Sequence, residues 1–173
     1  MLLETERLLF RHHLPEDLEP YCEIESDAEY RWPQKVHPRE ELERSFLQSC
    51  LPPKPMGLLA TVYKPEARYI GRCGIYPHRT EEGEIVPGEA NLAYYLARSH
   101  WGRGLATEAG ECFLRHGFET LGIRRIHAGV NALNGRSIRV AEKLGFILRA
   151  SGEGGGSRWH DYEISREDWI RRR

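Results

Sequence analysis

The clearest chemical signal in the chain comes from two glycines one residue apart, Gly102 and Gly104, just before a helical pattern that starts at Ala106. Glycine lets a backbone approach a ligand closely, and the first amide groups of a helix point outward without partners. Together with the positive end of the helix dipole and the charge of Arg103, such amides suit a phosphate or pyrophosphate. The glycines could instead only shape a tight strand-to-helix connection, so the loop favours an anion site without requiring one.

Other phosphate, metal and thiol chemistries have no matching motif. The pattern G-x-x-x-x-G-K-[ST] is absent, and a dinucleotide fingerprint would need glycine or alanine where Thr107 stands. The four cysteines form no C-x-x-C pair, and the eight histidines include no H-E-x-x-H spacing. We therefore expect no metal site, no disulfide framework and no cysteine acting as acyl carrier.

Length and composition indicate an ordinary globular chain. Its 173 residues suffice for one domain with a substantial core, so we expect a single domain over 1–173. With 29% charged residues, 40% apolar residues and a formal net charge of −1, the chain has no bias toward nucleic acid or anionic membrane. It has neither an apolar run of the roughly 20 residues that span a bilayer nor a signal-peptide pattern. The expected location is the cytoplasm.

The N-terminal half predicts helices followed by a hairpin. Apolar periodicity and turn residues place the elements in this order: strand 8–12, helix 15–27, helix 38–50, strands 57–63 and 68–75, a loop over 77–88, and strand 89–96. In the second helix, Leu42, Phe46 and Leu47 have helical spacing and should face the core.

The C-terminal half alternates strands and helices. The helix from Ala106 carries an apolar stripe through Phe113 and Leu114, strand 126–130 follows, and Asn134 opens another helix that ends before Gly145. A glycine-rich loop at 152–157 between two final strands, the second at 159–164, and a terminal turn at 166–173 complete the chain. The strand-helix-strand order predicts parallel pairing, with a ligand crevice at the carboxyl ends of the strands.

Three motifs in this half, in order and spacing, resemble the core of the GNAT acetyltransferases. They are Trp101-Gly102-Arg103-Gly104-Leu105-Ala106-Thr107-Glu108-Ala109, then Asn131-x-x-Asn134-x-x-Ser137, then Glu142-Lys143-Leu144-Gly145-Phe146. The similarity is greatest to the branch that includes the ribosomal-protein-alanine N-acetyltransferases, whose opening resembles Leu3-Glu4-Thr5-Glu6-Arg7-Leu8. The resemblance implies a mixed α/β fold, with a mostly antiparallel sheet, one parallel pair splayed at the acetyl-CoA crevice, and helices on both faces.

The resemblance also implies which residues bind acetyl-CoA. In the family, the loop at 102–107 holds the pyrophosphate, largely through backbone N–H groups. The implied contacts are Leu96, Ala97, Arg98, Trp101, Gly102, Arg103, Gly104, Leu105, Ala106, Thr107, Asn131, Asn134 and Ser137. Asn134 matches the asparagine that reaches the pantetheine arm, although asparagine is also a good helix N-cap and could serve both roles.

The groups that would move protons depart from the family pattern. Relatives carry glutamate where Asn91 stands, and asparagine cannot accept a proton. Glu89, two residues earlier on the same strand face, could act through water or could be a solvated strand-end charge. Ser137 is the branch's usual partner for the departing thiolate, since Ala141 occupies the tyrosine position of many relatives. Ser137 could equally be a small residue packed on the sheet.

The resemblance favours an N-acetyltransferase that moves the acetyl group of acetyl-CoA to a primary amine by direct attack in a ternary complex. The oxyanion would be held by a backbone N–H near residues 95–97. A protein N-terminus and a small-molecule amine both remain open as acceptors, and acids at Glu25, Asp27 and 81–84 could attract a cationic one. The alternatives are a non-catalytic acyl-CoA-binding or sensing module and an unrelated nucleotide-binding domain. Exposed edge strands would permit a homodimer.

Overall fold

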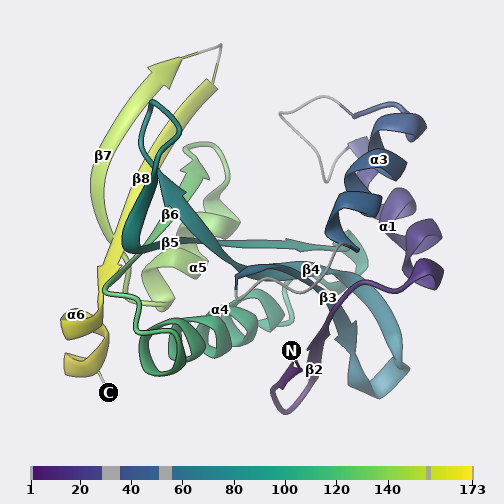
Figure 1. Ribbon diagram of the computed structural model, residues 1–173, viewed down its shortest axis with the longest axis horizontal. Coiled ribbons are helices and arrows are strands. Elements are labelled where there is room, and N and C mark those ends of the chain that lie inside the picture. The colour runs from purple at the N-terminus through teal and green to yellow at the C-terminus, as the bar shows by residue number, and fades with distance from the viewer. Residues whose placement is uncertain (1, 29–35, 51–55, 155–156, 173) are drawn as a thin grey trace. The chain divides into compact units, whose positions relative to one another are not determined.

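The computed structural model describes residues 2–28, 36–50, 56–154 and 157–172 (Figure 1). These residues divide into two compact units, one formed by Met1–Gly74 with Tyr94–Cys112 and the other by Ile75–Ala93 with Phe113–Arg173. Two long strands, β4 (Arg68–Arg79) and β5 (Ile85–Leu96), and helix α4 (Leu105–Arg115) contribute residues to both.

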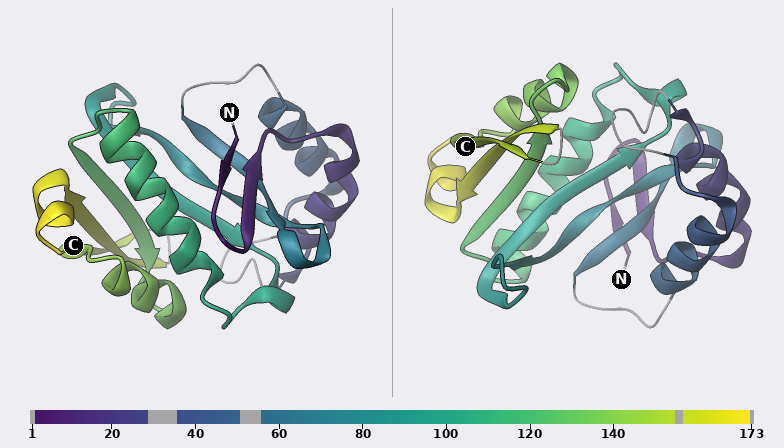
Figure 2. Two further views of the ribbon diagram at one scale, coloured as in Figure 1. Left: turned by 90° about the horizontal axis from the view of Figure 1, so that it is seen from below. Right: turned by 90° about the horizontal axis from the view of Figure 1, so that it is seen from above.

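The first unit combines an antiparallel sheet with two packed helices. Strand β1 (Leu3–Glu4) pairs with β2 (Leu8–Arg11), and β2 pairs with β3 (Gly57–Tyr63), both antiparallel. Helices α1 (Leu18–Glu25) and α3 (Arg39–Ser49) lie side by side (Figures 1 and 2). They bury an aromatic cluster against the sheet through Tyr21, Phe46 and Tyr69, which supplies much of this unit's apolar burial.

The second unit contains the parallel pair. Strand β6 (Arg125–Asn131) runs parallel to β5, while β8 (Ser157–Ser165) is antiparallel to both β6 and β7 (Ile147–Gly154). The strand order is β5-β6-β8-β7, and β7 and β8 form the long ribbon coloured green to yellow in Figure 1. Helices α5 (Gly135–Lys143) and α6 (Arg166–Arg171) complete the unit. The predicted mixed α/β class, mostly antiparallel with one parallel pair, is confirmed.

The parallel ladder between β5 and β6 is short. Its register runs from Glu89–Arg125 to Asn91–His127 and covers three residue pairs. Both strands continue past this point, β5 to Leu96 and β6 to Asn131. The parallel register therefore ends at Asn91 and His127, before either strand does.

Helix α4 confirms the predicted stripe in its middle and not at its ends. Phe113 and Leu114 are buried, and the chain continues as a π-helical stretch, His116–Thr120, in which Phe118 is also buried. Ala106 and Leu121, expected on the same stripe, are only half-buried.

Among the described residues, every helix falls short of the length and apolar character needed to cross a bilayer.

Two predicted loops are in fact mostly strand. Over 77–88, β4 extends to Arg79 and β5 starts at Ile85, so only a tight turn separates them. Gly83, at φ 87°, closes this turn with its amide on the carbonyl of Thr80, a backbone angle that glycine adopts without strain. Over 152–157, Gly152 pairs with Trp159 and the ladder with β8 continues to Gly154 and Ser157, while residues 155 and 156 lie outside the described part of the chain. In both places cross-strand hydrogen bonding outweighs the local preference of glycine and proline for turns and loops.

Smaller differences concern the ends of elements and one buried face. Leu42 and Phe46 are buried on α3 as expected, but Leu47 is 64% exposed, because the apolar stripe of this helix is narrower than the sequence spacing suggests. The short strand β1 was not predicted, and residues 166–171 form a helix instead of a turn.

Candidate functional site

The glycine loop lies in the first unit, where its backbone suits an anion. A 3-10 turn, Arg98–His100, leads into the loop, and α4 begins at Leu105. Gly102 and Gly104 have φ values of 75° and 77°, in the left-handed region that side chains disfavour. Gly102, Arg103 and Gly104 are exposed. The first-turn amides of α4 follow this exposed loop, as the sequence predicted.

An N-terminal network that the sequence analysis missed holds the start of α4. Glu108, in the first helical turn, accepts hydrogen bonds at Oε1 from the hydroxyl of Thr5 (2.5 Å) and the amide of Arg7 (3.0 Å). Its Oε2 accepts one from Nε of Arg7 (2.7 Å), and Nη1 of Arg7 donates to the carbonyl of Arg103 (3.0 Å). One arginine therefore joins the carboxylate on the helix to the backbone of the loop.

The loop's own arginine is partly compensated by a nearby acid. Nη1 of Arg103 lies 3.7 Å from Oε1 of Glu66, and its guanidinium carbon is 6.0 Å from the ring centre of Tyr63. His100, which is buried, lies 3.5 Å from the other oxygen of Glu66. Burial lowers the pKa of His100. Arg103, 45% exposed, still presents its charge to solvent.

The strand end before the loop is fixed by two hydrogen bonds. Nε1 of Trp101 donates to the carbonyl of Leu96 (2.7 Å), and the amide of Ala97 donates to the carbonyl of Ile70 (2.7 Å). The Ala97 amide is thus already engaged, so the oxyanion donor expected among residues 95–97 is not this one. Arg98 lies 3.2 Å from Asp27.

In the second unit, the two predicted asparagines shape the backbone around the start of α5. Asn134 is the N-cap of that helix, and its Oδ1 accepts from the amide of Ser137 (3.0 Å). Oδ1 of Asn131 accepts from the amide of Leu133 (2.8 Å). The N-cap alternative for Asn134 is therefore present, and the amide nitrogens of both side chains can still act as donors. Ser137 is half-buried and Ala141 is buried.

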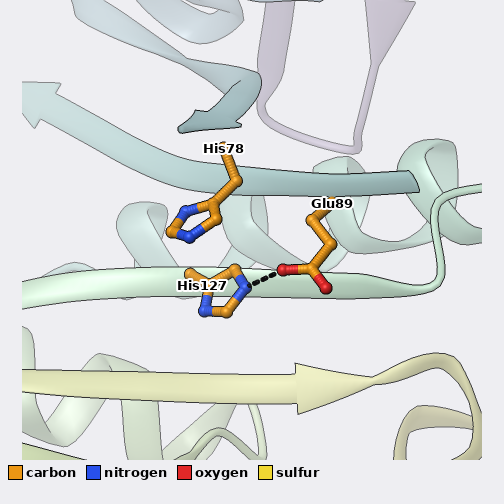
Figure 3. Close-up of side chains that lie close together, drawn as sticks. All are labelled: His78, Glu89 and His127. Atoms are coloured by element: carbon orange, nitrogen blue, oxygen red, sulfur yellow. Dashed lines mark hydrogen bonds and ion pairs between the residues drawn. The ribbon is translucent and has the colours of Figure 1, made fainter. Parts of the chain in front are cut away.

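Glu89 and Asn91 belong to a polar cluster on three strands of the second unit, and Figure 3 shows three of its members, His78, Glu89 and His127. Oε2 of Glu89 lies 2.7 Å from Nε2 of His127, and Oδ1 of Asn91 lies 3.2 Å from Nδ1 of His78. The two imidazole rings stack, with centroids 4.0 Å apart and planes 18° apart. No local pattern singles out His78 or His127, because residues 78 and 127 meet only through the fold.

At the buried end of this cluster, one ring nitrogen lacks a hydrogen-bond partner among the described residues. His127 is 8% exposed, and its Nδ1 is buried with no hydrogen-bond partner among the described residues. A buried ring nitrogen without a partner is unusual in a folded protein. Glu89 faces the more open side, where it lines a cavity of about 530 Å³ together with Arg124, Arg125, Ser165, Arg166, Glu167 and Ile170.

The predicted site residues therefore fall into two groups. Residues 96–107 lie in the first unit, whereas Glu89, Asn91, Asn131, Asn134 and Ser137 lie in the second.

The acids proposed to attract a cationic acceptor are partly neutralised. Glu25 is buried and lies 3.0 Å from Arg72, and Asp27 pairs with Arg98. Glu81, Glu82 and Glu84 are exposed at the β4–β5 turn, which is a common position for solvated charges. The loop at 30–37, where family members share no common pattern and which we also expect to shape the acceptor site, lies mostly outside the described residues.

Known proteins resemble this chain over most of its length. Residues 7–147 match the family model described as an acetyltransferase (GNAT) domain. An uncharacterised N-acetyltransferase, p20, from Bacillus licheniformis is 31% identical over 149 residues, which are 83% of this chain and 81% of that protein.

Two solved structures share the fold at lower identity. A ribosomal-protein-alanine acetyltransferase from Vibrio fischeri has a TM-score of 0.77 and 20% identity, covering 98% of each chain. An aminoglycoside acetyltransferase, AAC(6')-Ib, in complex with coenzyme A has a TM-score of 0.77 and 19% identity, covering 95% of this chain and 98% of that one. By family model, sequence relative and fold, the chain belongs to the GNAT family of acyl-CoA-dependent N-acetyltransferases.

Proposed function

We propose that the chain transfers the acetyl group of acetyl-CoA to a primary amine, on a protein N-terminus or a small molecule, by direct attack in a ternary complex. The observation that carries this proposal is the exposed loop with Gly102 and Gly104 at positive φ directly before α4. A helix start with free amides is suited to a pyrophosphate. A coenzyme A complex of a protein with the same fold supports acetyl-CoA as the donor.

In this proposal the loop binds the donor mainly through its backbone. Amides of Arg103, Gly104, Ala106 and Thr107 hold the pyrophosphate, and the exposed guanidinium of Arg103 adds charge. The adjoining segment lines the donor. Its members are Leu96, Ala97, Arg98, Trp101, Gly102 and Leu105.

The pantetheine arm and the thiolate are assigned to the start of α5. The side-chain amide nitrogens of Asn131 and Asn134 are available to donate to pantetheine carbonyls, since each Oδ1 is engaged with backbone. The Ser137 hydroxyl supplies the proton that the departing thiolate needs, because the tyrosine of many relatives is replaced by the buried Ala141.

In this proposal Glu89 is the general base that accepts the proton lost by the acceptor amine. An amine attacks a thioester only when neutral, so the ammonium must first lose a proton. The Glu89 carboxylate is 19% exposed and reaches solvent at the cavity, while its 2.7 Å contact with His127 fixes its orientation. A water molecule passes the proton, and Asn91 positions the stacked His78.

Direct attack is favoured over an acyl-enzyme because three of the four thiols are poor nucleophiles. Burial raises the pKa of Cys22 and raises that of Cys73 to about 12, and partial desolvation raises the pKa of the exposed Cys50. A thiol with a raised pKa forms little thiolate, and thiolate is the nucleophilic form.

The acceptor class is tested with a panel of amines. Thiol release from acetyl-CoA is measured with peptides beginning in alanine, with aminoglycosides and with simple polyamines. The first two classes are included because relatives with the same fold are named for ribosomal-protein alanine and aminoglycoside acetylation. We expect turnover with at least one class, and kcat reduced in Ser137→Ala and in Glu89→Gln. Absence of turnover on all of them would contradict the proposal.

A non-catalytic acyl-CoA-binding module is the second candidate, favoured by Asn91 and Ala141 at positions where relatives keep proton-transfer groups. It predicts tight acetyl-CoA binding by calorimetry together with no thiol release on the full panel. Binding of ATP or NAD without binding of coenzyme A would contradict both candidates.

A further inference from the structure

The second unit contains three potential metal ligands that no local sequence motif predicts. His78 comes from β4, Glu89 from β5 and His127 from β6, and Figure 3 shows the Glu89 carboxylate turned toward the His127 ring, with the His78 ring stacked beside it. One ligand atom from each lies within 4.8 Å of the others. The set comprises two imidazole nitrogens and one carboxylate oxygen.

This donor set has a defined metal preference. Imidazole favours Zn²⁺, Co²⁺, Ni²⁺ and Cu²⁺, whereas Mg²⁺ and Ca²⁺ prefer sites made of oxygen alone. Two histidines and one glutamate are also a known ligand set for zinc with an open coordination position. Arg124, Arg125 and Arg166 line the cavity beside Glu89, and their charge opposes any divalent cation, so selection here rests on the imidazole nitrogens.

The geometry needs only a modest adjustment to hold an ion. Metal–ligand distances of roughly 2.0–2.2 Å in a tetrahedral site place the ligand atoms about 3.4 Å apart. The widest separation of 4.8 Å must therefore close, and the stacked rings must tilt so that their lone pairs converge. His78 and Glu89 are half-buried, so their side chains have room to turn without disturbing the core.

The hydrogen bond between Glu89 and His127 does not block this step. An ion bound at Nε2 replaces the proton that Nε2 shares with the carboxylate, and that proton can move to Nδ1 of the same ring. Nδ1 of His127 has no hydrogen-bond partner among the described residues, so nothing described there fixes the tautomer against this exchange.

We propose that His78, Glu89 and His127 form a binding site for one borderline transition-metal ion, of the Zn²⁺ or Co²⁺ type, reached from the solvent side of Glu89. Asn91 is a positioning residue in this site, since its contact with Nδ1 of His78 orients that ring. Removing a hydrogen bond that orients a metal-binding histidine typically lowers metal affinity by about 10- to 100-fold.

The test is direct metal binding by the untagged full chain without acetyl-CoA. Co²⁺ is titrated while visible absorption is recorded, and Zn²⁺ is then added in competition. We expect one saturable site, with d–d bands of low coordination number that Zn²⁺ abolishes. His78→Asn, Glu89→Gln and His127→Asn should each weaken Co²⁺ binding by at least about 10-fold, with folding checked by circular dichroism.

The chain offers a matched control. His37, just before α3, and Glu41, in its first turn, also form a close histidine–carboxylate pair, 2.9 Å apart and exposed to solvent. His37→Asn should leave Co²⁺ binding unchanged. If His127→Asn fails to fold, the half-buried Glu89→Gln and His78→Asn decide the question.

Absence of a saturable site would overturn the proposal, as would equal weakening by His37→Asn and by the cluster variants. The measurement uses neither acetyl-CoA nor an acceptor, so it can fail while acetyl transfer stands, and the reverse. An ion bound here would occupy the Glu89 carboxylate, so the proton-transfer role proposed for Glu89 belongs to the metal-free protein.

Discussion

The glycine loop and the histidine–glutamate cluster are built in different ways. The loop is contiguous in sequence, presents backbone, and is held from outside by Arg7 and Glu108. The cluster gathers side chains from positions 78, 89, 91 and 127, each on a strand. A ligand-binding backbone can thus be encoded by local residue order, whereas converging side chains need strand pairing to bring them together.

The two regions also differ in what supports them. Loop conformation depends on glycine φ angles and on one half-buried ion pair, so its perturbation should affect stability and donor binding together. Cluster side chains stand on a paired sheet that does not need them for its ladder, so their perturbation should affect chemistry and ligand binding with little loss of stability.

Acidification should give the largest loss of stability. It should also distinguish the contribution of Glu108, which supports the glycine loop, from that of His13 elsewhere in the first unit. Burial among Tyr21, Phe46 and Tyr69 lowers the pKa of His13 to about 4. A lowered histidine pKa means the unfolded chain binds the extra proton. Stability is therefore complete above pH 6.5 and falls as the pH drops toward 4, by about 3 kcal/mol.

Glu108 adds a second, more acidic step. Burial raises the pKa of its carboxyl, but hydrogen bonds from Thr5 and Arg7 outweigh burial and leave the pKa below 4.5. Its contribution is present above pH 4.5 and lost as the pH falls through the folded-state pKa. Urea unfolding at stepped pH should show the first step removed in His13→Phe and the second in Glu108→Gln. Identical pH profiles for all three proteins would refute both assignments.

Removal of the Glu108 carboxylate should lower the free energy of unfolding by about 2–3 kcal/mol, because Thr5 and Arg7 lose a charged acceptor. A double-mutant cycle with Arg7→Ala, followed by urea denaturation, measures the coupling. We also expect weaker acetyl-CoA binding, since Arg7 holds the Arg103 carbonyl. Strict additivity of the two single substitutions would show that the ion pair does not support the loop.

Glu89→Gln should have the opposite profile, with kcat reduced about 10- to 100-fold and stability changed by no more than about 1 kcal/mol. Its control is Glu84→Gln, in the exposed β4–β5 turn. Asn91→Glu in the Glu89→Gln background should restore part of the lost kcat, since it supplies a carboxylate on the same strand face. An unchanged kcat in Glu89→Gln would remove this residue from the proton path.

Gly104→Ala should have the smallest effect and isolates loop conformation. A Cβ at Gly104 has space, with its nearest atom 3.7 Å away, so only the φ of 77° is strained. Gly83→Ala is a matched control, at φ 87° and with no atom within 4 Å. Both should lose about 1 kcal/mol of stability, but only Gly104→Ala should weaken acetyl-CoA binding, by roughly 5- to 10-fold. Equal acetyl-CoA affinities would contradict a loop that binds through its backbone.

The sequence predicted some elements well and misjudged others for identifiable reasons. Strand Gly57–Tyr63 and helix α3 match closely, since their periodicity and flanking prolines are local signals. Pro77 and Gly152 suggested loops, yet both lie in strands, because a ladder supplied by a distant segment outweighed local preference. Local spacing gave no sign of the role of Glu108, because its partners Thr5 and Arg7 are about a hundred residues away in the chain.

The sequence by itself determined the family motifs, the glycine loop and the N-cap at Asn134, because each depends on residues within a few positions of one another. Only the tertiary structure decided that Arg7 supports the loop and that His78, Glu89 and His127 converge. The three cluster residues are brought together by strand pairing and ring stacking between segments up to 49 positions apart in the sequence, counting from 78 to 127. The spacing of residues within one segment does not predict which distant segment it pairs with.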